Sequence, residues 1–525
     1  MIMKKFFVTT PIYYVNDKPH VGSTYTTVAA DVLARYHRSR GDRTLFSTGV
    51  DENSQKNVQA MEKSGETDLQ AYLDRMSDTW KTTWEELGIV FDTFVRTTEP
   101  RHLAAVSRFW NAVKQSGDIY ESVYEGLYCV GCEGFKTETE TVDGKCPLHP
   151  NSELSPVKEK NYFFRASAYR EALLNHLDEN SQFVQPESRR NEIRNYITEH
   201  FTDFSISREA KQVSAGIPVP EDSNQRIYVW FDALINYLTV TGYGTDDKMC
   251  AEWWPADIHL IGKDILKFHC ALWPAMLMSA AKNDPLLRDE NGNPKLPTRV
   301  FAHGYFTING QKISKSLGNA IDPRALVPTY GFDAVRYFML REIPFGEDGD
   351  FSESRLTERY THDLANTLGN LLQRTIAMSR KYFDGKVPPS FSHEAKYTFA
   401  DEAGIRAIRN AVDTNMEACR FDLALEAIWS GVDGAHGLLH ANKFIEDTQP
   451  FKLQKTDPTA TGAILYSILE YLRIISLLLA PFMPDVSERM LKQLGQNTDS
   501  NLSWGGLKPG TELPEPVVLF KMLNN

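Results

Sequence analysis

The sequence predicts an α/β protein in which a Rossmann-like parallel sheet carries an insertion and is followed by a helical domain. Two observations support this fold class. Short buried strand patterns alternate with helical patterns in the first 115 residues and return after residue 226, which is typical of a parallel sheet. Beyond about residue 355, few strand patterns remain and apolar residues recur at helical spacing. The predicted segments are a first Rossmann-like half at 1–115, an insertion at 116–225, a second half at 226–300, a loop and linking domain at 301–354 and a helical domain at 355–525.

The composition is that of a soluble globular protein. Of the 525 residues, 42% are hydrophobic and 24% are charged, which excludes a disordered chain, a collagen and a disulfide miniprotein. The net charge of -12 does not suit non-specific coating of a duplex, so a nucleic-acid partner would have to meet a local basic surface. Six cysteines in so long a chain are too few for a disulfide framework.

The N-terminal elements follow from short apolar runs and their breakers. Residues 6–10 predict a strand that ends at Pro11, and a helical pattern begins after Gly22. Residues 44–49 predict a second buried strand, and residues 80–87 carry Trp and Leu at helical spacing. This order of strand and helix is the start of a parallel α/β sheet.

The later elements repeat this pattern and then give way to helices. Residues 227–231 and 258–262 are apolar runs that predict two more strands. The most apolar region, residues 464–483, contains Glu470 and Arg473 and predicts an amphipathic core helix that is too interrupted to span a bilayer. The N-terminus shows no small-residue cleavage site, so we expect a cytoplasmic protein with no membrane partner.

The insertion contains a metal-binding pattern. Cys129-x-x-Cys132 is followed by Cys146-x-x-His149, and the four side chains would close around one tetrahedral Zn²⁺ ion. No ligand position is left open, so the predicted zinc is structural, and thiolate ligands imply a reducing compartment. Four unrelated residues are the alternative.

Two further motifs point to phosphate chemistry. His20-Val21-Gly22-Ser23 lies between a predicted strand and a helix, where free backbone N–H groups and positive potential favour a phosphate. Lys312-Ile313-Ser314-Lys315-Ser316 lies between glycines and suits a mobile loop that closes on a polyphosphate. Taken singly, an ordinary βα turn and a solvated charged loop are the favoured alternatives.

Together and in this order, the two motifs resemble the HIGH and KMSKS signatures of class I aminoacyl-tRNA synthetases. Additional segments are similar to the methionyl-tRNA synthetase family, and they are residues 11–20, 49–52, 203–208, 228–233 and 261–269. The resemblance covers nearly the whole chain. It implies a methionine–tRNA ligase that forms methionyl-adenylate and pyrophosphate from methionine and ATP and then charges tRNA(Met), with Mg²⁺ accompanying ATP. The helical domain would bind the anticodon, and the zinc knuckle would belong to the connective insertion.

The resemblance also implies roles at the phosphate site. The catalytic residues would be His20, Lys312 and Lys315, which stabilise the α-phosphate. The ATP-binding residues would be Gly22, Ser23, Gly262, Asp264, His303 and Lys315. Asp264 would bind the ribose. For His303 a structural histidine is an equal alternative.

A thioether side chain needs apolar walls, aromatic faces and few strong donors. By resemblance, the methionine-binding residues would be Ile12, Tyr14, Asp51, Trp230, Ala233, Leu234, Tyr237, Ile265 and His269. Tyr14 would close over the side chain and Asp51 would accept the α-ammonium group. Core packing is the alternative for each apolar residue, above all Ile265, and an N-cap is the alternative for Asp51.

The anticodon-binding residues implied by the resemblance are Asn370, Arg374, Pro450 and Phe451. Single-stranded bases are usually read by stacking on aromatic or guanidinium groups and by hydrogen bonds. The family usually has Trp after the proline, so Phe451 would offer a smaller stacking platform. A buried residue at a helix start is the alternative for Phe451.

Some positions depart from the family pattern. Ser23 replaces the last histidine of HIGH, and Asn53 and Ser54 replace a histidine and a glycine in the usual GTDEHG motif. We expect activity, at a lower rate. The chain ends after the helical domain, so a monomer is expected. The rivals are another class I synthetase, for which the insertion is too short to hold an editing domain, and a non-catalytic tRNA-binding paralogue, which pyrophosphate exchange would reveal.

Overall fold

The computed structural model divides the chain into two compact units. Unit 1 comprises Met1–Ala30, Gly41–Glu85 and Ile89–Gly304, and unit 2 comprises Asp31–Arg40, Glu86–Gly88 and Tyr305–Asn525. The described residues are 4–129, 134–136, 141–147, 153–213, 215–308, 310–313, 321–389, 397–432, 434–498 and 500–523, with the backbone alone for 134–136 and 311–312.

Unit 1 is built on a six-stranded sheet with the order β3-β2-β1-β12-β13-β7. Its strands are β1 (Lys5–Tyr14), β2 (Arg43–Asp51), β3 (Thr93–Arg96), β7 (Val184–Gln185), β12 (Ile258–Gly262) and β13 (Val300–His303). All five pairings are parallel, which confirms the predicted Rossmann-like sheet. The chain adds β2 and β3 on one side of β1 and β12 and β13 on the other. The carboxyl ends of β1 and β12 therefore form the topological switch point, where α/β sheets bind ligands.

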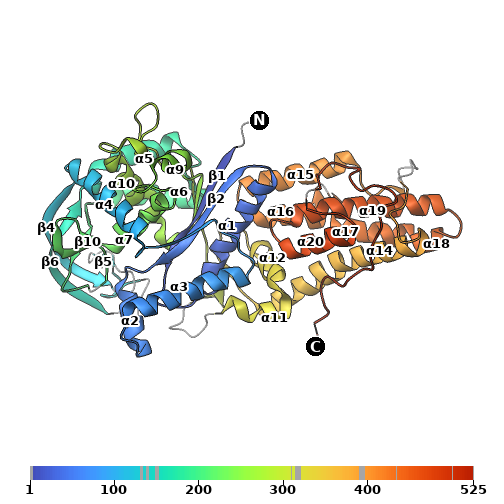
Figure 1. Cartoon of the computed structure of the whole chain (residues 1–525), viewed down its shortest axis with the longest axis horizontal. Helices are drawn as coiled ribbons and strands as arrows, with labels where there is room; N and C mark the ends of the chain where they lie inside the picture. The colour runs from blue at the N-terminus through green and yellow to red at the C-terminus, as the bar shows by residue number, and fades with distance from the viewer. Residues whose placement is uncertain are drawn as a thin grey trace. The chain divides into compact units, whose positions relative to one another are not determined.

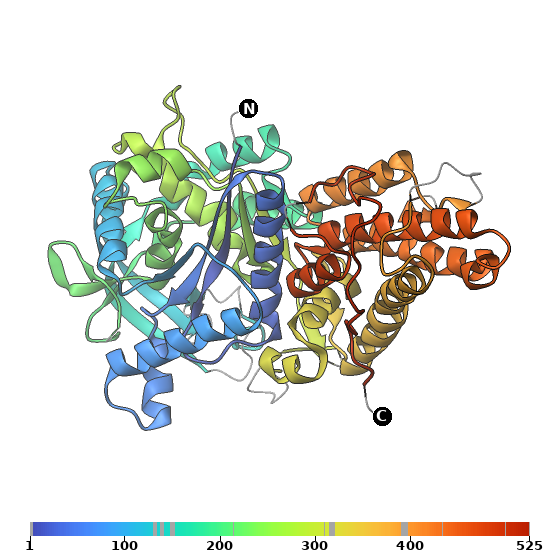
Figure 2. The ribbon, with the colours of Figure 1, turned by 45° about the vertical axis from the view of Figure 1, so that its right-hand side comes forward.

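Helices surround this sheet (Figure 1). They are α1 (Val21–Ser39), α2 (Gln55–Ser64), α3 (Leu69–Glu86), α4 (Pro100–Gln115), α5 (Arg170–Glu179), α6 (Glu187–Glu199), α7 (Val229–Leu234), α8 (Asn236–Thr239), α9 (Asp247–Trp253) and α10 (Trp273–Ala280), with short helical turns η2 (Ala166–Tyr169), η3 (Lys263–Ile265), η4 (Phe268–Leu272) and η5 (Pro285–Leu287). The part of α1 that belongs to unit 1, up to Ala30, follows β1 and lies alongside β1 and β2 in both views (Figures 1 and 2).

Strand β1 does not end where the sequence predicts. Pro11 lies inside β1, and the pairing with β2 shifts register between Thr9 and Ile12. Proline has no N–H to donate, and an irregularity of this kind is where a strand tolerates it. The strand therefore continues to Tyr14 and carries Ile12 and Tyr14 to the edge of the sheet.

The predicted strand at 227–231 is wrong. Strand β11 (Asp222–Ile227) ends at Ile227, Tyr228 is extended, and α7 begins at Val229. A short apolar run is compatible with either a buried strand or a buried helix, and its length alone cannot separate them. The predicted strands at 44–49 and 258–262 are confirmed as parts of β2 and β12.

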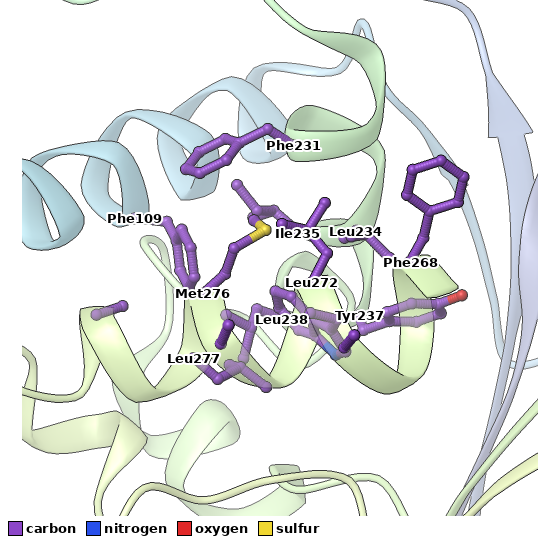
Figure 3. Packing of buried hydrophobic residues seen from close by; sticks show 14 of the residues in the cluster. Phe109, Phe231, Leu234, Ile235, Tyr237, Leu238, Phe268, Leu272, Met276 and Leu277 are labelled. Atoms are coloured by element: carbon purple, nitrogen blue, oxygen red, sulfur yellow. The ribbon is translucent and has the colours of Figure 1, made fainter. Parts of the chain in front are cut away.

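The core of unit 1 is formed by large apolar side chains from α4, α7, α8 and α10. Figure 3 shows Phe109, Phe231, Leu234 and Met276 packed against one another, with the Tyr237 hydroxyl at the edge of the cluster on the side of Phe268. Phe109 and Phe231 are fully buried, and their ring centroids are 6.0 Å apart. This packing holds α7 and α8 in place against α4 and α10.

The insertion is mostly antiparallel. A four-stranded sheet has the order β5-β4-β6-β8 and a three-stranded sheet the order β10-β11-β9. Their further bounds are β4 (Ile119–Cys129), β5 (Gly134–Lys136), β6 (Leu154–Phe164), β8 (Phe204–Ser205), β9 (Ser207–Glu209) and β10 (Pro218–Val219). Arg208 and Glu159 form a buried two-bond ion pair, with N–O distances of 2.8 and 2.7 Å.

Unit 2 is predominantly helical, as predicted (Figure 2). Its elements are β14 (Phe306–Ile308), β15 (Gln311–Lys312), η7 (Pro323–Ala325), α11 (Val327–Tyr330), α12 (Phe332–Glu342), β16 (Gly349–Asp350), α13 (Glu353–Arg359), η8 (Tyr360–Gly369), α14 (Asn370–Tyr382), α15 (Glu402–Glu417), α16 (Phe421–Ser430), β17 (Gly431–Val432), β18 (Ala435–His436), α17 (Leu438–Thr448), α18 (Pro450–Leu453), α19 (Pro458–Leu479) and α20 (Pro484–Gln493).

Helix α19 is the core helix of unit 2. In the described part of the chain it is the one helix long and apolar enough to cross a membrane, but 89% of that window is buried inside the protein. Its two charged side chains, Glu470 and Arg473, are buried and form an ion pair with an N–O distance of 2.7 Å. Glu470 also accepts the backbone N–H groups of Gly506 and Leu507, so its carboxylate is satisfied inside the bundle.

Candidate active site

The structure brings the predicted ligand-binding residues of unit 1 to one edge of the parallel sheet. Ile12 and Tyr14 lie at the carboxyl end of β1, and Asp51 is the last residue of β2. Gly262 and His303 end β12 and β13. Because the carboxyl ends of parallel strands meet at one edge, these residues surround the switch point between β1 and β12.

The HVGS motif forms the first turn of α1. Two of its side chains accept hydrogen bonds from its own backbone. The N–H of Gly22 donates to His20 Nδ1 at 3.0 Å, and the N–H of His20 donates to Ser23 Oγ at 3.2 Å. The two side chains thus satisfy backbone donors reciprocally, as in a capping box. Since Nδ1 accepts, the proton of the neutral imidazole is on Nε2, at the opposite side of the ring.

The glycine of this motif lets the His20 imidazole lie close to the helix start. A Cβ at position 22 would lie 2.9 Å from Cε1 of His20, which is shorter than a contact between such atoms allows. Ser23 is 7% exposed and also donates its hydroxyl to the carbonyl of His20 at 2.9 Å. In this chain, therefore, Ser23 stabilises the helix start that orients His20.

Asp51 is buried at the end of β2. The carboxylate accepts the N–H of Asn53 at 3.1 Å, and the Thr97 hydroxyl lies at 3.5 Å. The N-cap alternative is wrong, because α2 is capped by Ser54, whose hydroxyl accepts the N–H of Lys56. A carboxylate that is 3% exposed and that does not cap a helix suits a cationic ligand group.

A buried polar chain, which the sequence did not reveal, links the end of β2 to α4 and α7. The Asn53 amide donates to Asp232 Oδ2 at 2.8 Å. The other oxygen of Asp232 lies 2.6 Å from Nε2 of His102, whose Nδ1 lies 2.8 Å from Thr239 Oγ1. Asp232 and His102 are completely buried. The only sequence signal was Asn53 itself, at the position where the family pattern has histidine.

The predicted methionine pocket contains a second hydrogen-bonded pair. Burial raises the pKa of Tyr237, so the protonated hydroxyl donates to His269 Nε2 at 2.7 Å. His269 Nδ1 donates to the carbonyl of Ile265 at 3.0 Å, because that oxygen can only accept. Burial also lowers the pKa of His269 to about 4, so the ring is neutral at pH 7. A neutral, hydrogen-bonded pair suits an uncharged thioether.

The aromatic wall is formed by Trp230 and Phe268. Their rings stack with centroids 3.9 Å apart and an interplanar angle of 4°. Ala233 and Leu234 follow on α7 and are 6% and 2% exposed, and Leu234 belongs to the apolar core of unit 1. Leu234 is therefore a core residue, as its alternative interpretation proposed. Trp230, in contrast, is only partly buried.

Among the predicted ATP-binding residues, some are exposed and others are buried in the protein. Asp264, just after β12, is exposed, and Gly262 is buried. His303 is 3% exposed, with Nε2 at 2.6 Å from Thr26 Oγ1 and Nδ1 at 2.6 Å from the carbonyl of Gly304. Both nitrogens of His303 therefore serve the protein itself, which favours its structural alternative.

Part of the predicted phosphate and metal chemistry lies outside the described residues. The backbone of Lys312 is in β15 and Ile313 is 7% exposed, but Lys315 lies outside the described residues. Cys132 and His149 also lie outside them, and among the residues described no group of metal ligands is assembled.

The described half of the zinc pattern consists of Cys129 and Cys146. Cys129 ends β4, and both Cys129 and Cys146 are fully buried. Val142 and Lys145 exchange backbone hydrogen bonds of 2.9 and 3.0 Å around Asp143 and Gly144, whose φ angles are 52° and 69°. Residues 142–145 of this tight turn are exposed, whereas Cys146 directly after it is buried. A buried cysteine after an exposed turn fits a thiolate that serves as a metal ligand.

In unit 2, three of the four predicted anticodon residues lie at least partly on helix surfaces, whereas Pro450 is buried. Asn370 and Arg374 are partly exposed, one turn apart on α14. Pro450 and Phe451 begin α18, and Phe451 is 46% exposed. The alternative of a buried helix-start residue is therefore wrong for Phe451.

The parallel sheet, the HVGS turn at its switch point and the helical second unit define a class I aminoacyl-tRNA synthetase. The family described as tRNA synthetases class I (M) matches residues 6–154 and 150–376. The family described as the anticodon binding domain of methionyl tRNA ligase matches residues 392–525.

Individual relatives agree over the full length. Methionine–tRNA ligase of Thermotoga maritima is 43% identical over 99% of this chain and 80% of its own length. That of Thermosynechococcus vestitus is 43% identical over 99% of this chain and 97% of its own length. The structure of Mycobacterium tuberculosis methionyl-tRNA synthetase in complex with methionyl-adenylate matches with a TM-score of 0.91 and 40% identity, over 99% of this chain and all of that one. The chain belongs to the methionyl-tRNA synthetase family, and its activity is the ATP-dependent ligation of methionine to tRNA.

Proposed function

We propose that the sheet edge of unit 1 performs both steps of this ligation. A carboxylate oxygen of methionine attacks the α-phosphorus of ATP, which forms methionyl-adenylate and releases pyrophosphate. A terminal ribose hydroxyl of tRNA(Met) then attacks the adenylate carbonyl carbon, and AMP leaves. The observation that carries this proposal is the gathering of His20, Asp51 and the ends of β1 and β12 at one switch point.

Methionine is held by charge at one end and by apolar surface at the other. Asp51 binds the α-ammonium group, and the Tyr237–His269 pair faces the thioether without offering a charge. Tyr14 closes over the side chain. The remaining wall is formed by Ile12, Trp230, Ala233, Leu234, Ile265 and, behind Trp230, Phe268.

ATP lies at the N-terminus of α1. His20 donates from Nε2 to the α-phosphate, and the dipole of the helix favours the same anion. Gly22 allows close approach, Ser23 orients His20, and Asp264 with Gly262 receives the ribose. Lys312 and Lys315 neutralise the departing pyrophosphate, and His303 supports the adenine site from behind. Mg²⁺ bound to ATP would supply further charge neutralisation at the phosphates.

The helical unit reads the anticodon. Asn370 and Arg374 supply hydrogen bonds from one face of α14, and Phe451, after Pro450, supplies an exposed ring for stacking. These groups are partly or largely exposed before RNA binds, as recognition of splayed bases requires.

We also propose one structural Zn²⁺ ion bound by Cys129, Cys132, Cys146 and His149. The buried thiols of Cys129 and Cys146 beside an exposed tight turn support it. Thiolate ligands need a reducing environment, which supports a cytoplasmic enzyme. We propose that it acts as a monomer.

The test is methionine-dependent ATP–pyrophosphate exchange without tRNA, with cysteine, leucine and isoleucine as controls. Exchange with methionine alone is expected. In the variant Asp51→Asn, we expect the KM for methionine to rise about 10- to 100-fold with little change in the KM for ATP, since a charged hydrogen bond contributes roughly 1.5–3 kcal/mol. Exchange with another amino acid would refute the pocket, and a KM change for ATP alone would refute the role of Asp51.

A further inference from the structure

The helix that carries Asn370 and Arg374 changes its register at the start of α14. The π-helix η8 (Tyr360–Gly369) runs directly into α14 (Asn370–Tyr382), so Asn370 is the first residue in α register. At this junction the N–H of Asn370 is shared between the carbonyls of Ala365 and Thr367. π-helical segments are rare and are often found at functional sites.

A side chain from a neighbouring helix meets the same carbonyl. Asn442 on α17 donates its amide to the carbonyl of Thr367 at 3.1 Å and to the carbonyl of Leu438, on its own helix, at 3.0 Å. An amide nitrogen has two hydrogens, so these two bonds use both. The Thr367 carbonyl therefore receives both the backbone of Asn370 and the side chain of Asn442. Helix α17 packs against η8.

The other end of α17 leads to the exposed ring of Phe451. Only Gln449 separates α17 (Leu438–Thr448) from α18, which begins at Pro450. Gln449 has φ 44° and ψ 58°, a left-handed conformation that is unusual for a residue other than glycine. Its carbonyl accepts the N–H of Lys452 at 2.8 Å, which closes the turn. The chain from Asn442 to Phe451 is thus a helix and one fixed turn.

These contacts join the two predicted anticodon-reading segments through one side chain. A second bond, from Trp429 Nε1 on α16 to the carbonyl of Asp363 at 3.3 Å, holds η8 one turn earlier. That bond fixes η8 to α16 but does not reach the junction or α17. Asn442 is therefore the side chain that ties the backbone at Asn370 to the helix leading to Phe451.

We propose that Asn442 is a positioning residue for anticodon recognition, which sets the spacing between Asn370 with Arg374 and the Phe451 ring without touching RNA. This inference rests on the anticodon-reading role proposed above. A stacking platform and its hydrogen-bonding partners must be correctly spaced before a base is bound, because ordering them afterwards would cost binding free energy. Loss of the brace should weaken tRNA binding and leave methionine activation unchanged.

The test compares Asn442→Ala with the matched control Asn415→Ala. Asn415, on α15, is also partly buried and donates to the carbonyl four residues earlier at 2.8 Å, and among the described residues no second bond from its amide crosses to another helix. For Asn442→Ala we expect the aminoacylation KM for tRNA to rise about tenfold with kcat nearly unchanged. Pyrophosphate exchange and thermal stability should match those of Asn415→Ala.

A double variant separates positioning from direct contact. In a Phe451→Ala background there is no ring left to position, so adding Asn442→Ala should change the KM for tRNA less than twofold. Losses that multiply in full would show that Asn442 binds RNA by itself and would overturn the proposal. Equal charging by Asn442→Ala and Asn415→Ala would overturn it as well. If the unaltered protein exchanges pyrophosphate but fails to charge tRNA(Met), the proposed function itself fails.

Discussion

The two recognition surfaces of this chain are built in opposite ways. Around the amino-acid site, the polar groups are buried and bonded in series, from Asn53 through Asp232 to His102, and from Tyr237 to His269. On the helical unit, the groups proposed to meet RNA are partly or largely exposed, and Phe451 has 46% of its surface open. In that unit the fixed elements are backbones, held by bonds such as that of Asn442.

The size of the ligand explains the difference. Methionine is small, so its pocket must be formed in advance if little binding energy is to be lost on ordering it. An anticodon brings bases that stack on any exposed ring and can adjust their own conformation. Substitutions around the amino-acid site of unit 1 should therefore lower both stability and the rate of methionine activation. Substitutions on the proposed RNA-binding surface of unit 2 should lower tRNA affinity alone.

The largest effect is expected from His102→Leu. The change leaves the carboxylate of Asp232 buried, with the Asn53 amide as its remaining partner among those described above. Loss of a hydrogen-bond donor to a buried acceptor costs about 1–3 kcal/mol. Urea unfolding should show this loss, and pyrophosphate exchange should fall at least 100-fold as the end of β2 shifts.

A milder variant keeps this prediction testable if His102→Leu does not fold. Thr239→Val removes the hydroxyl at Nδ1 of His102 and leaves the His102–Asp232 contact in place. It should lose about 1–2 kcal/mol of stability with a several-fold drop in exchange. Exchange at the unaltered rate in both variants would show that the buried chain does not position the site.

A buried carboxyl in unit 2 gives the next effect, and it concerns stability alone. Burial raises the pKa of Asp333 to about 7, while its Oδ2 accepts the N–H of Val486 at 2.7 Å. In the unfolded chain this group titrates near 4, so between about pH 4 and pH 7 the folded state binds the extra proton. Stability from this group is therefore present at low pH and is lost as the pH rises to about 7.

The variant Asp333→Asn should not show this loss of stability as the pH rises. The amide oxygen can still accept from Val486, and no charge has to be buried at neutral pH. We expect the variant to be more stable than the unaltered protein at pH 8, by on the order of 3 kcal/mol, and to differ little at pH 4. Thermal melts at the two pH values measure this, and a gain that is the same at both would contradict the assignment.

The sequence indicated which residues form the site better than it indicated the hydrogen bonds that hold them in place. The family resemblance named Asp51, Gly262 and the HVGS turn as site residues, and the structure places Asp51 and Gly262 at the carboxyl ends of parallel strands, which meet at one edge by topology. The bond from Asn53 to Asp232 joins positions 179 apart and depends on how α7 packs, which no local pattern shows. The run at 227–231 has too few residues to reveal its period, so its helix was predicted as a strand.

A smaller effect is expected from Tyr237→Phe. This change removes the donor to His269 Nε2 and leaves a buried acceptor without its partner, at a cost of about 1–3 kcal/mol. The kcat/KM for methionine should fall about tenfold while the KM for ATP stays constant, because the hydroxyl belongs to the proposed methionine pocket. Tyr237 lies in unit 1 and is fully buried, so it should not affect tRNA binding directly. If the rate of tRNA charging fell further than the rate of methionine activation, the result would contradict this prediction.

The smallest effect, and the only expected gain, is that of Phe451→Trp. Position 451 is 46% exposed beside Lys452, whose ammonium lies 5.8 Å from the ring centroid, so a larger ring can extend into solvent. Stacking on an aromatic side chain contributes about 1–3 kcal/mol per base, and the larger indole should add a fraction of that. The kcat/KM for tRNA(Met) should rise about threefold, with exchange and unfolding unchanged. If the indole instead weakens charging, the spacing set by Asn442 is matched to phenylalanine, and RNA recognition here is limited by geometry more than by stacking area.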